Sequence, residues 1–471
     1  MELPLEGVKV VELTIAVAGP SAGATLCVCI CLAQTEAFSC PDHDAPLAQR
    51  QARCSSGCLP AAVRRSYPLL SLDHSADYGA DVIKVEPPSG DTQRWIVAGL
   101  GMAAEDPYIE SPHFYQINRG KRSVCLDLKS DEGMSALHTL LDEADVFLSN
   151  MRYGSLKGLG LGAEELLEAH PQLIVCPMTG WGMEGPEADK PVYDVAGFWA
   201  RSSAASSHTP RGEYPPILVP GFGDVTTALS AVGGICAALV SRAKTGKGRA
   251  LTTSLLRTGM HVNGWALSNY FARGRVVSWG QRDRTGNPVA TAYRAGDDKL
   301  FWLIGFEAGR HWPPTMRAIG KHEWLEGGSE YEQYKSPATR RKLEQDIVAE
   351  MDAIFATAPL AEWGEKFDAE GVWWCPVQDP EEVSKDPQAI ASGAFVDIPA
   401  GAADIEAGRT DLKSVASPVD FLGTDSSPRQ GVPALGEHTV SALEEAGVAP
   451  EVIEKVLQAY RDGAPEGRAR L

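Results

Sequence analysis

The sequence predicts an α/β fold, in which a largely parallel sheet has helices on both faces and a smaller α+β domain is attached to it. Three observations support this prediction. Short β-rich runs alternate with helical runs between residues 114 and 256. The joints between these runs carry Asn, Arg, Lys, Gly and Asp, and such joints hold the ligand-handling residues of α/β proteins. From about Asn287 the pattern changes to an antiparallel hairpin followed by helices.

The first half of the chain carries the clearest strand and helix signals. Residues 8–13 alternate like a buried strand and lead into an Ala-Gly-Pro turn, where proline is well placed to open a helix. A second strand over residues 80–86 ends at a Pro-Pro-Ser-Gly turn. Ser130 is expected to cap a helix whose first turn is acidic. Further strands are expected over residues 123–128, 145–148, 173–177 and 251–255, and further helices over 163–170 and 225–240.

The second half predicts the smaller domain and a return to the larger one. A hairpin is expected from residues 292–295 and 299–304, then helices over 310–319 and 338–356, an extended stretch near 418–422 and a final helix over 439–446. The predicted domains are therefore a large one from residues 1–26 and 76–285, a small α+β one from 286–390, and a return to the large one over 391–471.

Residues 27–75 do not fit this plan. Six of the ten cysteines lie there, while Cys125, Cys176, Cys236 and Cys375 have apolar surroundings typical of reduced core cysteines. Joining Leu26 to Ala76 would give one uninterrupted strand–helix–strand unit, so the segment interrupts the first helix. We interpret it as disordered or as a translated intron or gene-model artefact. The other interpretation is a zinc loop with His43, but the cysteine spacings match no closed four-ligand pattern, and we expect no metal.

Composition limits the possible partners. The chain has 471 residues, 44% of them hydrophobic and 22% charged, which is ordinary for a globular protein of two or three domains. A formal net charge of -19 argues against nucleic-acid binding. No apolar run approaches the ~20 residues that cross a bilayer, so we expect no membrane partner. The N-terminal residues lack a signal peptide and predict a cytoplasmic protein; alternatively, the final Ala-Arg-Leu resembles a peroxisomal address.

Arg119, Lys121 and Arg122 form the densest basic cluster of the α/β region. They lie at the mouth of a predicted strand, where they could neutralise phosphates. The alternative is a solvated basic loop without a ligand.

A series of motifs resembles the class III CoA-transferase family, also called CaiB/BaiF, which includes formyl-CoA transferase, carnitine CoA-transferase and α-methylacyl-CoA racemase. In chain order they read GVKVVEL, ADYGADVIKVE, GD-x-x-R, N-x-x-KRS-x-x-LDLK, ADVFLSN, TGWG-x-x-GP, PVYD, VPGFGD, KTGKG and LGEHT. The resemblance covers nearly the whole chain except residues 27–75, and it is closest to the branch acting on aryl-lactate and 2-hydroxyacid CoA thioesters. It implies a Rossmann-like large domain made from both chain ends and an interlocked homodimer.

The resemblance also implies a site for coenzyme A, which is a substrate here and not a tightly bound cofactor. Residues at matching positions that are expected to contact CoA are Val17, Ala18, Arg94, Asn118, Lys121, Arg122, Asn150, Met151 and Gly180. Some members of the family carry an arginine at a position where this chain has Gly158, with Lys157 beside it. The contact that this arginine makes with CoA is therefore not expected here in the same form.

The implied reaction moves CoA from an acyl-CoA to a free carboxylic acid through an enzyme carboxylate. Asp224 matches an aspartate that is catalytic in the racemase branch, although it could simply cap the helix that follows. Glu213 lies near the position of the nucleophile in formyl-CoA transferase-like members, or is a solvated loop acid. Asp194 is a third candidate, or another helix cap. Asp224 is the favoured nucleophile.

Two other functions remain open. Racemisation needs a second base, usually histidine, and the matching position here is Tyr193, which disfavours it. A non-catalytic CoA-binding paralogue, or a product misfolded by residues 27–75, is the remaining alternative.

Overall fold

The computed structural model describes residues 5–26, 79–94, 111–210, 212–276, 281–401, 404–405, 408–424, 427–428 and 430–463. The predicted insertion at 27–75, with its six cysteines and His43, and the C-terminal tripeptide lie outside these residues.

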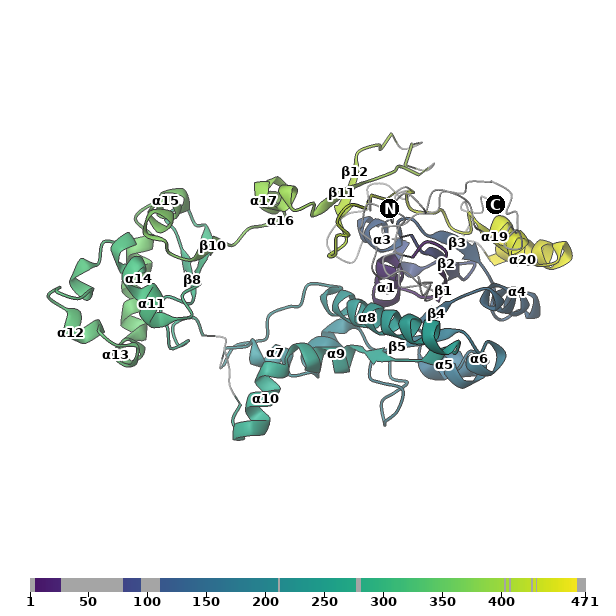
Figure 1. Cartoon of the computed structure of the whole chain (residues 1–471), viewed down its shortest axis with the longest axis horizontal. Helices are drawn as coiled ribbons and strands as arrows, with labels where there is room; N and C mark the ends of the chain where they lie inside the picture. The colour runs from purple at the N-terminus through teal and green to yellow at the C-terminus, as the bar shows by residue number, and fades with distance from the viewer. Residues whose placement is uncertain are drawn as a thin grey trace, which may run out of the picture. The chain divides into compact units, whose positions relative to one another are not determined.

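The centre of the larger unit is a parallel sheet (Figure 1). Its strands are β1 (Lys9–Leu13), β2 (Asp81–Glu86), β3 (Arg122–Cys125), β4 (Val146–Ser149), β5 (Ile174–Thr179), β6 (Arg249–Ala250) and β7 (Thr253–Ser254). They run in the order β3-β2-β1-β4-β5-β6, and β7 also pairs with β5. This is the doubly wound order of Rossmann-like folds, so the predicted fold class is confirmed.

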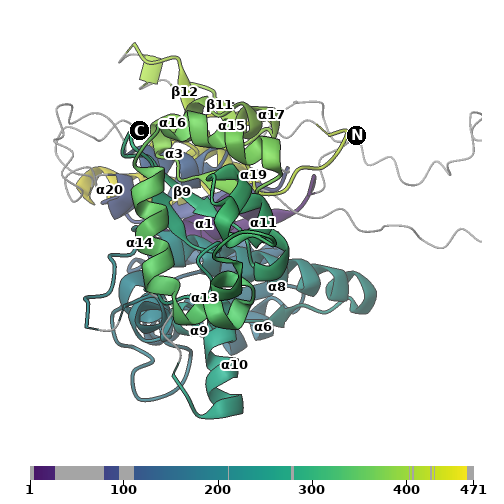
Figure 2. The ribbon, with the colours of Figure 1, turned by 90° about the vertical axis from the view of Figure 1, so that its left-hand side faces the viewer.

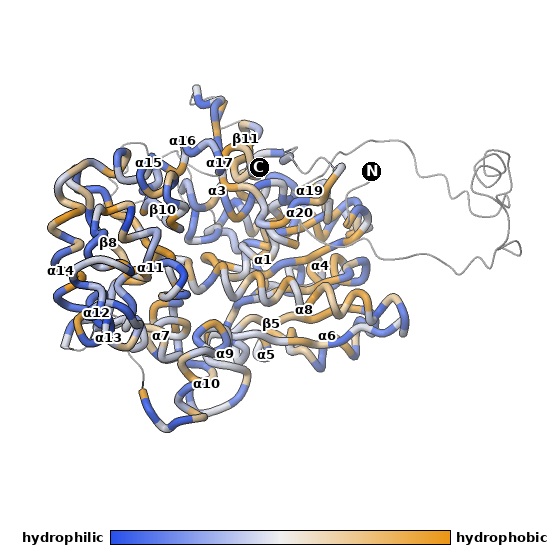
Figure 3. Tube along the Cα trace, turned by 60° about the vertical axis from the view of Figure 1, so that its left-hand side comes forward, coloured by the Kyte–Doolittle hydropathy of each residue, from blue (hydrophilic) through white to orange (hydrophobic). Residues whose placement is uncertain are grey.

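Helices cover both faces of this sheet because neighbouring strand residues point to opposite sides. Val10 belongs to a core that includes residues of α1 (Ala18–Leu26) and α8 (Phe222–Thr245), whereas Val11 belongs to a core with α4 (Asp131–Asp142), α6 (Ala163–Ala169), α19 (Thr439–Glu445) and α20 (Pro450–Gly463). Figure 3 shows the apolar residues along β5 and α8. Each fully buried valine or leucine contributes roughly 1.5–3 kcal/mol, and these two cores hold the sheet together.

Short elements complete the unit. They are η1 (Thr92–Arg94), α3 (Pro112–Asn118), α5 (Tyr153–Gly158), β11 (Phe395–Ile398) and β12 (Leu412–Val415). As predicted, Ser130 caps α4, and its side chain accepts a hydrogen bond from the Gly133 amide.

Cys125 and Cys176 are buried, and burial raises the pKa of the Cys176 thiol to about 12. Cys375, in the other unit, is exposed, so its predicted core position is wrong.

Helix α8 is the one helix of the described residues that is long and apolar enough to cross a membrane, with a mean hydropathy of 1.5. The sequence-based statement that no apolar run approaches this length is therefore wrong. Its Ala228, Ala231 and Ile235 side chains pack into the core of the sheet instead. A core helix between a sheet and solvent passes the same test of length and composition.

The second unit comprises residues 192–223 and 255–395. One part contains η3 (Val195–Ala200), a π-helical turn, with α7 (Ala204–Ser207), α9 (Leu255–Val262) and α10 (Gly264–Arg273). In the other part, β8 (Ala292–Arg294), β9 (Leu300–Leu303) and β10 (Trp374–Pro376) form an antiparallel sheet. Helices α11 (Ala308–Ala318), α14 (Glu344–Phe355) and α15 (Leu360–Glu370) share an aromatic core with this sheet (Figure 2). The shorter helices here are η4 (His322–Trp324), α12 (Tyr331–Tyr334), α13 (Pro337–Lys342), α16 (Pro380–Lys385) and α17 (Pro387–Ala391).

The structure differs from the sequence prediction at several boundaries. The sequence predicted that residues 192–223 and 255–285 belong to the large domain, but they belong to the second unit. There η3 and α9 pack closely on each other, since a Cβ added at Gly259 on α9 would lie 2.3 Å from the Phe198 carbonyl oxygen on η3. The strand expected over 251–255 is only β7, since α9 begins at Leu255. The helix expected over 338–356 is divided into α13 and α14, and α20 was not predicted.

Candidate functional site

The sheet order creates a switch point between β1 and β4, where the chain changes the direction in which it adds strands. Ligands of doubly wound sheets bind beyond the carboxyl ends of the strands at such a point. The Asn150 side chain, just after β4, spans it: its Oδ1 accepts from the Ile15 amide (2.9 Å) and its Nδ2 donates to the Ile15 carbonyl (2.6 Å).

We call these two hydrogen bonds between Asn150 and Ile15 the Asn150 clamp. The clamp brings together four residues that the sequence predicted for CoA. Val17 and Ala18 lie where the loop after β1 enters α1, and Asn150 and Met151 directly follow β4. Gly180 follows β5, the next strand along the same edge. Gly19 allows the close approach, because a Cβ there would lie 2.6 Å from Thr14 and 2.9 Å from Asn150.

A buried ion pair holds the loop from the other side. The Ala16 amide donates to Asp91 Oδ1 (3.1 Å), and Ala16 itself has a φ of 60°, in the left-handed region. Lys84 Nζ donates to Asp91 Oδ2 (2.8 Å) and to the Thr14 carbonyl (3.0 Å). Burial opposes the charge of Lys84, but Asp91, Glu12 and Glu86 outweigh it and raise the lysine pKa. The loop that faces the switch point is thus held from two sides, by Asn150 and by the pair of Lys84 and Asp91.

Arg94, predicted to contact CoA, has a different role in the structure. Its guanidinium is fully buried, pairs with both oxygens of Glu86 (2.7 and 2.8 Å), donates to the Pro433 carbonyl and lies over the Phe114 ring. Burial alone would raise the pKa of Glu86, but Arg94, Lys84 and Ser123 lower it to about 2. This geometry does not support the predicted contact of Arg94 with CoA; its side chain instead links Glu86, at the end of β2, to the segment at Pro433.

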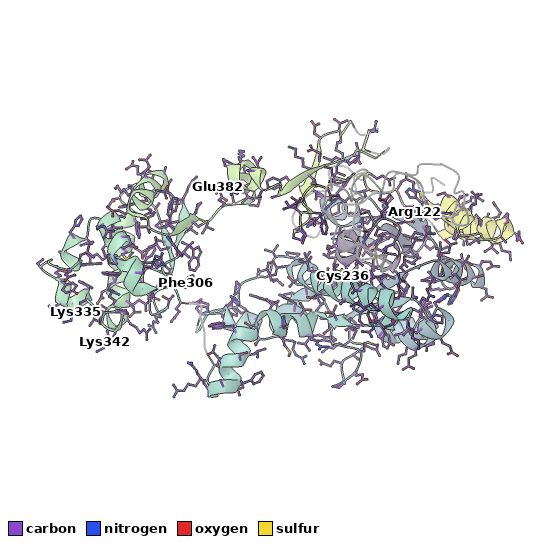
Figure 4. All side chains as sticks on the ribbon, viewed as in Figure 1. Arg122, Cys236, Phe306, Lys335, Lys342 and Glu382 are labelled. Atoms are coloured by element: carbon purple, nitrogen blue, oxygen red, sulfur yellow. The ribbon has the colours of Figure 1, made fainter. Side chains whose placement is uncertain are left out.

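Lys121 and Arg122 also point inward. Lys121 Nζ donates to Glu12 (2.8 Å), the Pro20 carbonyl (2.8 Å) and Asn118 Oδ1 (3.1 Å), so its three N–H groups are used. Arg122, which is labelled in Figure 4, pairs with Asp81 and with Glu445 on α19. Asn118 itself is buried beside Lys121. This geometry does not support the prediction that Lys121 and Arg122 neutralise phosphates, while contact of Asn118 with CoA stays a prediction. The alternative interpretation, a solvated basic loop without a ligand, is not supported either, because Lys121 and Arg122 are buried.

The signal for these inward charges was present in the sequence. Glu12, Lys84 and Glu86 interrupt apolar strand runs, and strands of a parallel sheet covered on both faces leave no solvated side for them. A buried charge requires a partner. Sequence reasoning assigned roles to the arginines and lysines near the motifs but missed Asp91, Lys84 and Glu12, which position the loop.

The three candidate nucleophiles have different surroundings. Asp194 is buried, and its Oδ2 accepts from the Gly223 amide in the first turn of α8 (3.1 Å). Glu213 is exposed in a turn after Pro210. Asp224 is half-buried and is the third residue of the 24-residue helix α8. The hydrogen bond of Asp194 to an amide in the first turn of α8 fits the alternative that this residue is a helix cap.

Tyr193, in place of the racemase histidine, is highly exposed. Within the described ranges, no group of three or more His, Cys, Asp or Glu side chains is arranged to hold a metal ion.

Comparisons with known proteins agree with this architecture. Residues 73–439 match the family model "CoA-transferase family III". A relative from Clostridium sporogenes, cinnamoyl-CoA:phenyllactate CoA-transferase, is 29% identical over 81% of this chain and 90% of its own length. Human succinyl-CoA:glutarate CoA-transferase is 26% identical over 78% of this chain and 80% of its own. The crystal structure of a CAIB/BAIF family protein from Brucella suis matches with a TM-score of 0.73 and 25% identity, over 95% of this chain and all of that one. The chain belongs to family III of the CoA-transferases.

Proposed function

We propose that the protein transfers CoA from an acyl-CoA to a free carboxylic acid, with Asp224 as the covalent nucleophile. The observation that carries this assignment is the capping of α8 by Asp194. Asp194 accepts from the Gly223 amide, so the first turn of α8 has a carboxylate acceptor besides Asp224, which is the third residue of the helix.

The surroundings of Asp224 suit this role. The N-terminus of a long helix carries partial positive charge, which keeps a nearby carboxylate ionised and nucleophilic. Glu213 is in open solvent, where water would compete for an anhydride. Asp194 is fixed in a cap by its hydrogen bond. We therefore rank Asp224 before Asp194 and Glu213.

The reaction balances without a further reactant. A carboxylate oxygen of Asp224 attacks the thioester carbonyl, the C–S bond breaks, and a mixed anhydride and the CoA thiolate result. The thiolate attacks the aspartyl carbonyl, releases the donor acid and leaves an enzyme thioester. The acceptor carboxylate repeats the two steps in reverse and leaves with CoA, which regenerates Asp224.

For CoA itself we propose a site at the switch point, with Val17, Ala18, Asn150, Met151 and Gly180. Its support is the clamp between β1 and β4 and the general position of ligands in this fold. For the acids we propose compact apolar or aryl carboxylic acids. The motifs favour that branch, and a relative from Clostridioides difficile, 28% identical, is named (R)-2-hydroxy-4-methylpentanoate CoA-transferase.

We further propose that the protein is a homodimer. In support, α10 has no buried side chain, and its Trp265 and Phe271 are 75% and 79% exposed. Large apolar side chains left exposed on one helix are typical of an interaction surface.

Trapping of the enzyme thioester tests the nucleophile. The protein is incubated with an acyl-CoA, treated with hydroxylamine or borohydride, and digested for peptide mapping. We expect the modification on Asp224; modification of Asp194 or Glu213 alone would refute the assignment. Isotope exchange between CoA thioesters and free acids separates transfer from racemisation, which would give α-proton washout without exchange.

A further inference from the structure

The segment that follows β5 is a surface loop over residues 180–191, which we call the β5 loop. None of its residues is buried. The base of the loop is closed by Trp181, whose Nε1 donates to the Lys190 carbonyl (3.1 Å). Compact surface loops whose ends lie close together are frequently functional, and this one begins at Gly180, a proposed CoA contact.

One carboxylate joins the β5 loop to helix α5. Asp189 Oδ1 accepts a hydrogen bond from the Gly154 amide (2.9 Å), in the first turn of α5. Arg152, the residue at the cap position of this helix, makes no side-chain hydrogen bond to it. Asp189 therefore supplies the missing cap from 35 positions further along the chain.

Gly154 is suited to this contact. A Cβ at its position would lie 2.6 Å from Asp189 Oδ1 and 2.9 Å from Asp189 Cγ, so the carboxylate would have to move. Glycine is unfavourable within a helix, because it loses more conformational freedom on folding than any other residue. The glycine in the first turn of α5 is therefore explained by the close approach of Asp189 and not by helix propensity.

The contact links two segments that carry proposed CoA contacts. Strands β4 and β5 pair with each other, and Asn150 and Met151 follow the first, while Gly180 follows the second. Beyond the strand ends, the bond between Asp189 and Gly154 holds the two segments together again. Segments with few buried side chains belong to the least stable parts of a protein, so polar anchors of this kind determine where they lie.

We propose that Asp189 is a positioning residue for acyl-CoA, which docks the β5 loop on α5 and so fixes Gly180 relative to Asn150 and Met151. The carboxylate acts through the backbone that it holds and not by touching the substrate. The role in CoA binding rests on the proposed function, whereas the docking of the loop does not.

Calorimetry on the full chain, with free CoA as the probe, tests the role in binding. Asp189→Ala should weaken CoA binding roughly fivefold or more, because the loop loses a charge-assisted hydrogen bond. Glu184→Ala, an exposed position in the same loop, is the matched control and should bind CoA like the wild type. Wild-type affinity in Asp189→Ala would overturn the proposal, whatever happens to the melting temperature.

A conservative variant and hydrogen exchange test the docking itself. Asp189→Asn keeps an acceptor oxygen and should retain most of the affinity for CoA. A loss as large as that of Asp189→Ala would show that the charge acts without the hydrogen bond, and would overturn the docking. Amide exchange in the peptide that contains Gly154, followed by mass spectrometry, should be faster in Asp189→Ala and unchanged in Glu184→Ala.

The reciprocal variant tests whether the two residues act together. Gly154→Ala should also weaken CoA binding, because the added methyl group displaces the carboxylate. In the Asp189→Ala background the same substitution should cause no further loss and should raise the melting temperature, since alanine is the better helix former once the carboxylate is gone. Losses that simply add in the double variant would refute the link between Asp189 and Gly154.

Kinetics separate this inference from the proposed function. If the wild type transfers CoA, Asp189→Ala should raise KM for the acyl-CoA and leave kcat and the KM for the acid largely unchanged. A raised KM for the acid alone would refute the positioning role. Weakened CoA binding in a protein that shows no CoA exchange would refute the proposed transfer and leave the positioning role standing. A wild type that binds no CoA would refute both.

Discussion

Individual charged residues determine how the ligand loop is held. Glu12, Lys84, Glu86, Asp91, Arg94 and Lys121 are all buried in the larger unit. Three are acidic and three basic, so the group is neutral, and each charge has an opposite charge within salt-bridge distance. Breaking one such pair leaves an uncompensated charge in a low-dielectric interior.

The first prediction concerns Asp224. Asp224→Asn should reduce CoA exchange roughly 10³-fold or more, because an amide cannot form the anhydride. The measurement is isotope exchange between an acyl-CoA and its free acid, with melting temperature as a check on folding. Glu213→Gln, in an exposed turn, is the matched control and should retain full exchange. If Asp224→Asn keeps wild-type activity, the nucleophile is another residue.

The second prediction concerns stability and pH. Glu86 has a pKa of about 2 in the folded chain against an ordinary 4.5, so its contribution is present above about pH 4.5 and is lost as the pH falls toward 2. Glu86→Gln should lower the free energy of unfolding by about 3–5 kcal/mol near pH 7, because Arg94 loses its buried partner. The difference from wild type should shrink below pH 4.5.

Denaturant unfolding at several pH values measures this difference. Glu168→Gln, an exposed position on α6, is the control and should show no measurable change. A Glu86→Gln difference that stays constant from pH 7 to pH 3 would contradict the cited pKa.

At the scale of elements, the loop between β1 and α1 is the part that shapes the switch point. The strand and the helix were both predictable from periodicity, since residues 8–13 alternate and an Ala-Gly-Pro turn follows. The clamp by Asn150 was not, because Asn150 is 135 positions from Ile15 and meets it only once β1 and β4 pair. The ion pair of Lys84 and Asp91, which fixes the loop to β2, is local by contrast, because the two residues are 7 positions apart.

The third prediction tests this loop. Gly19→Ala would place a methyl group 2.6 Å from the Thr14 side chain, so either the loop or the Asn150 clamp must move. We expect a loss of about 1–3 kcal/mol in stability and a raised KM for acyl-CoA. Gly158→Ala is the matched control, because nothing lies within 4 Å of its Cβ position and its φ is ordinary. Thermal unfolding and initial rates compare the two. Equal behaviour of both variants would show that the close approach at Gly19 is unimportant.

At the scale of the whole molecule, the apolar surface of α10 predicts self-association. The double variant Trp265→Asp with Phe271→Asp should shift the protein from dimer to monomer in light scattering after size exclusion, because charges are unfavourable in an apolar interface. Ile390→Asp, a 57% exposed position on α17, is the control and should remain a dimer. A wild type that elutes as a monomer at micromolar concentration would refute the homodimer.

The sequence alone determined the fold class, the order of most elements and the family. Those properties depend on local patterns: alternation in β1 and β2, the cap at Ser130, and motifs read in chain order. It also indicated that Asp224 begins a long helix. Tertiary structure decided what the charged motif residues do. Arg94 was expected to contact CoA, but it turns back to Glu86, eight positions earlier in the chain. Lys121 and Arg122 looked like phosphate ligands beside a strand end, but pairing of β1, β2 and β3 brings them to Glu12 and Asp81. Sequence spacing cannot reveal this, because the direction of a side chain depends on which distant strand lies beside it.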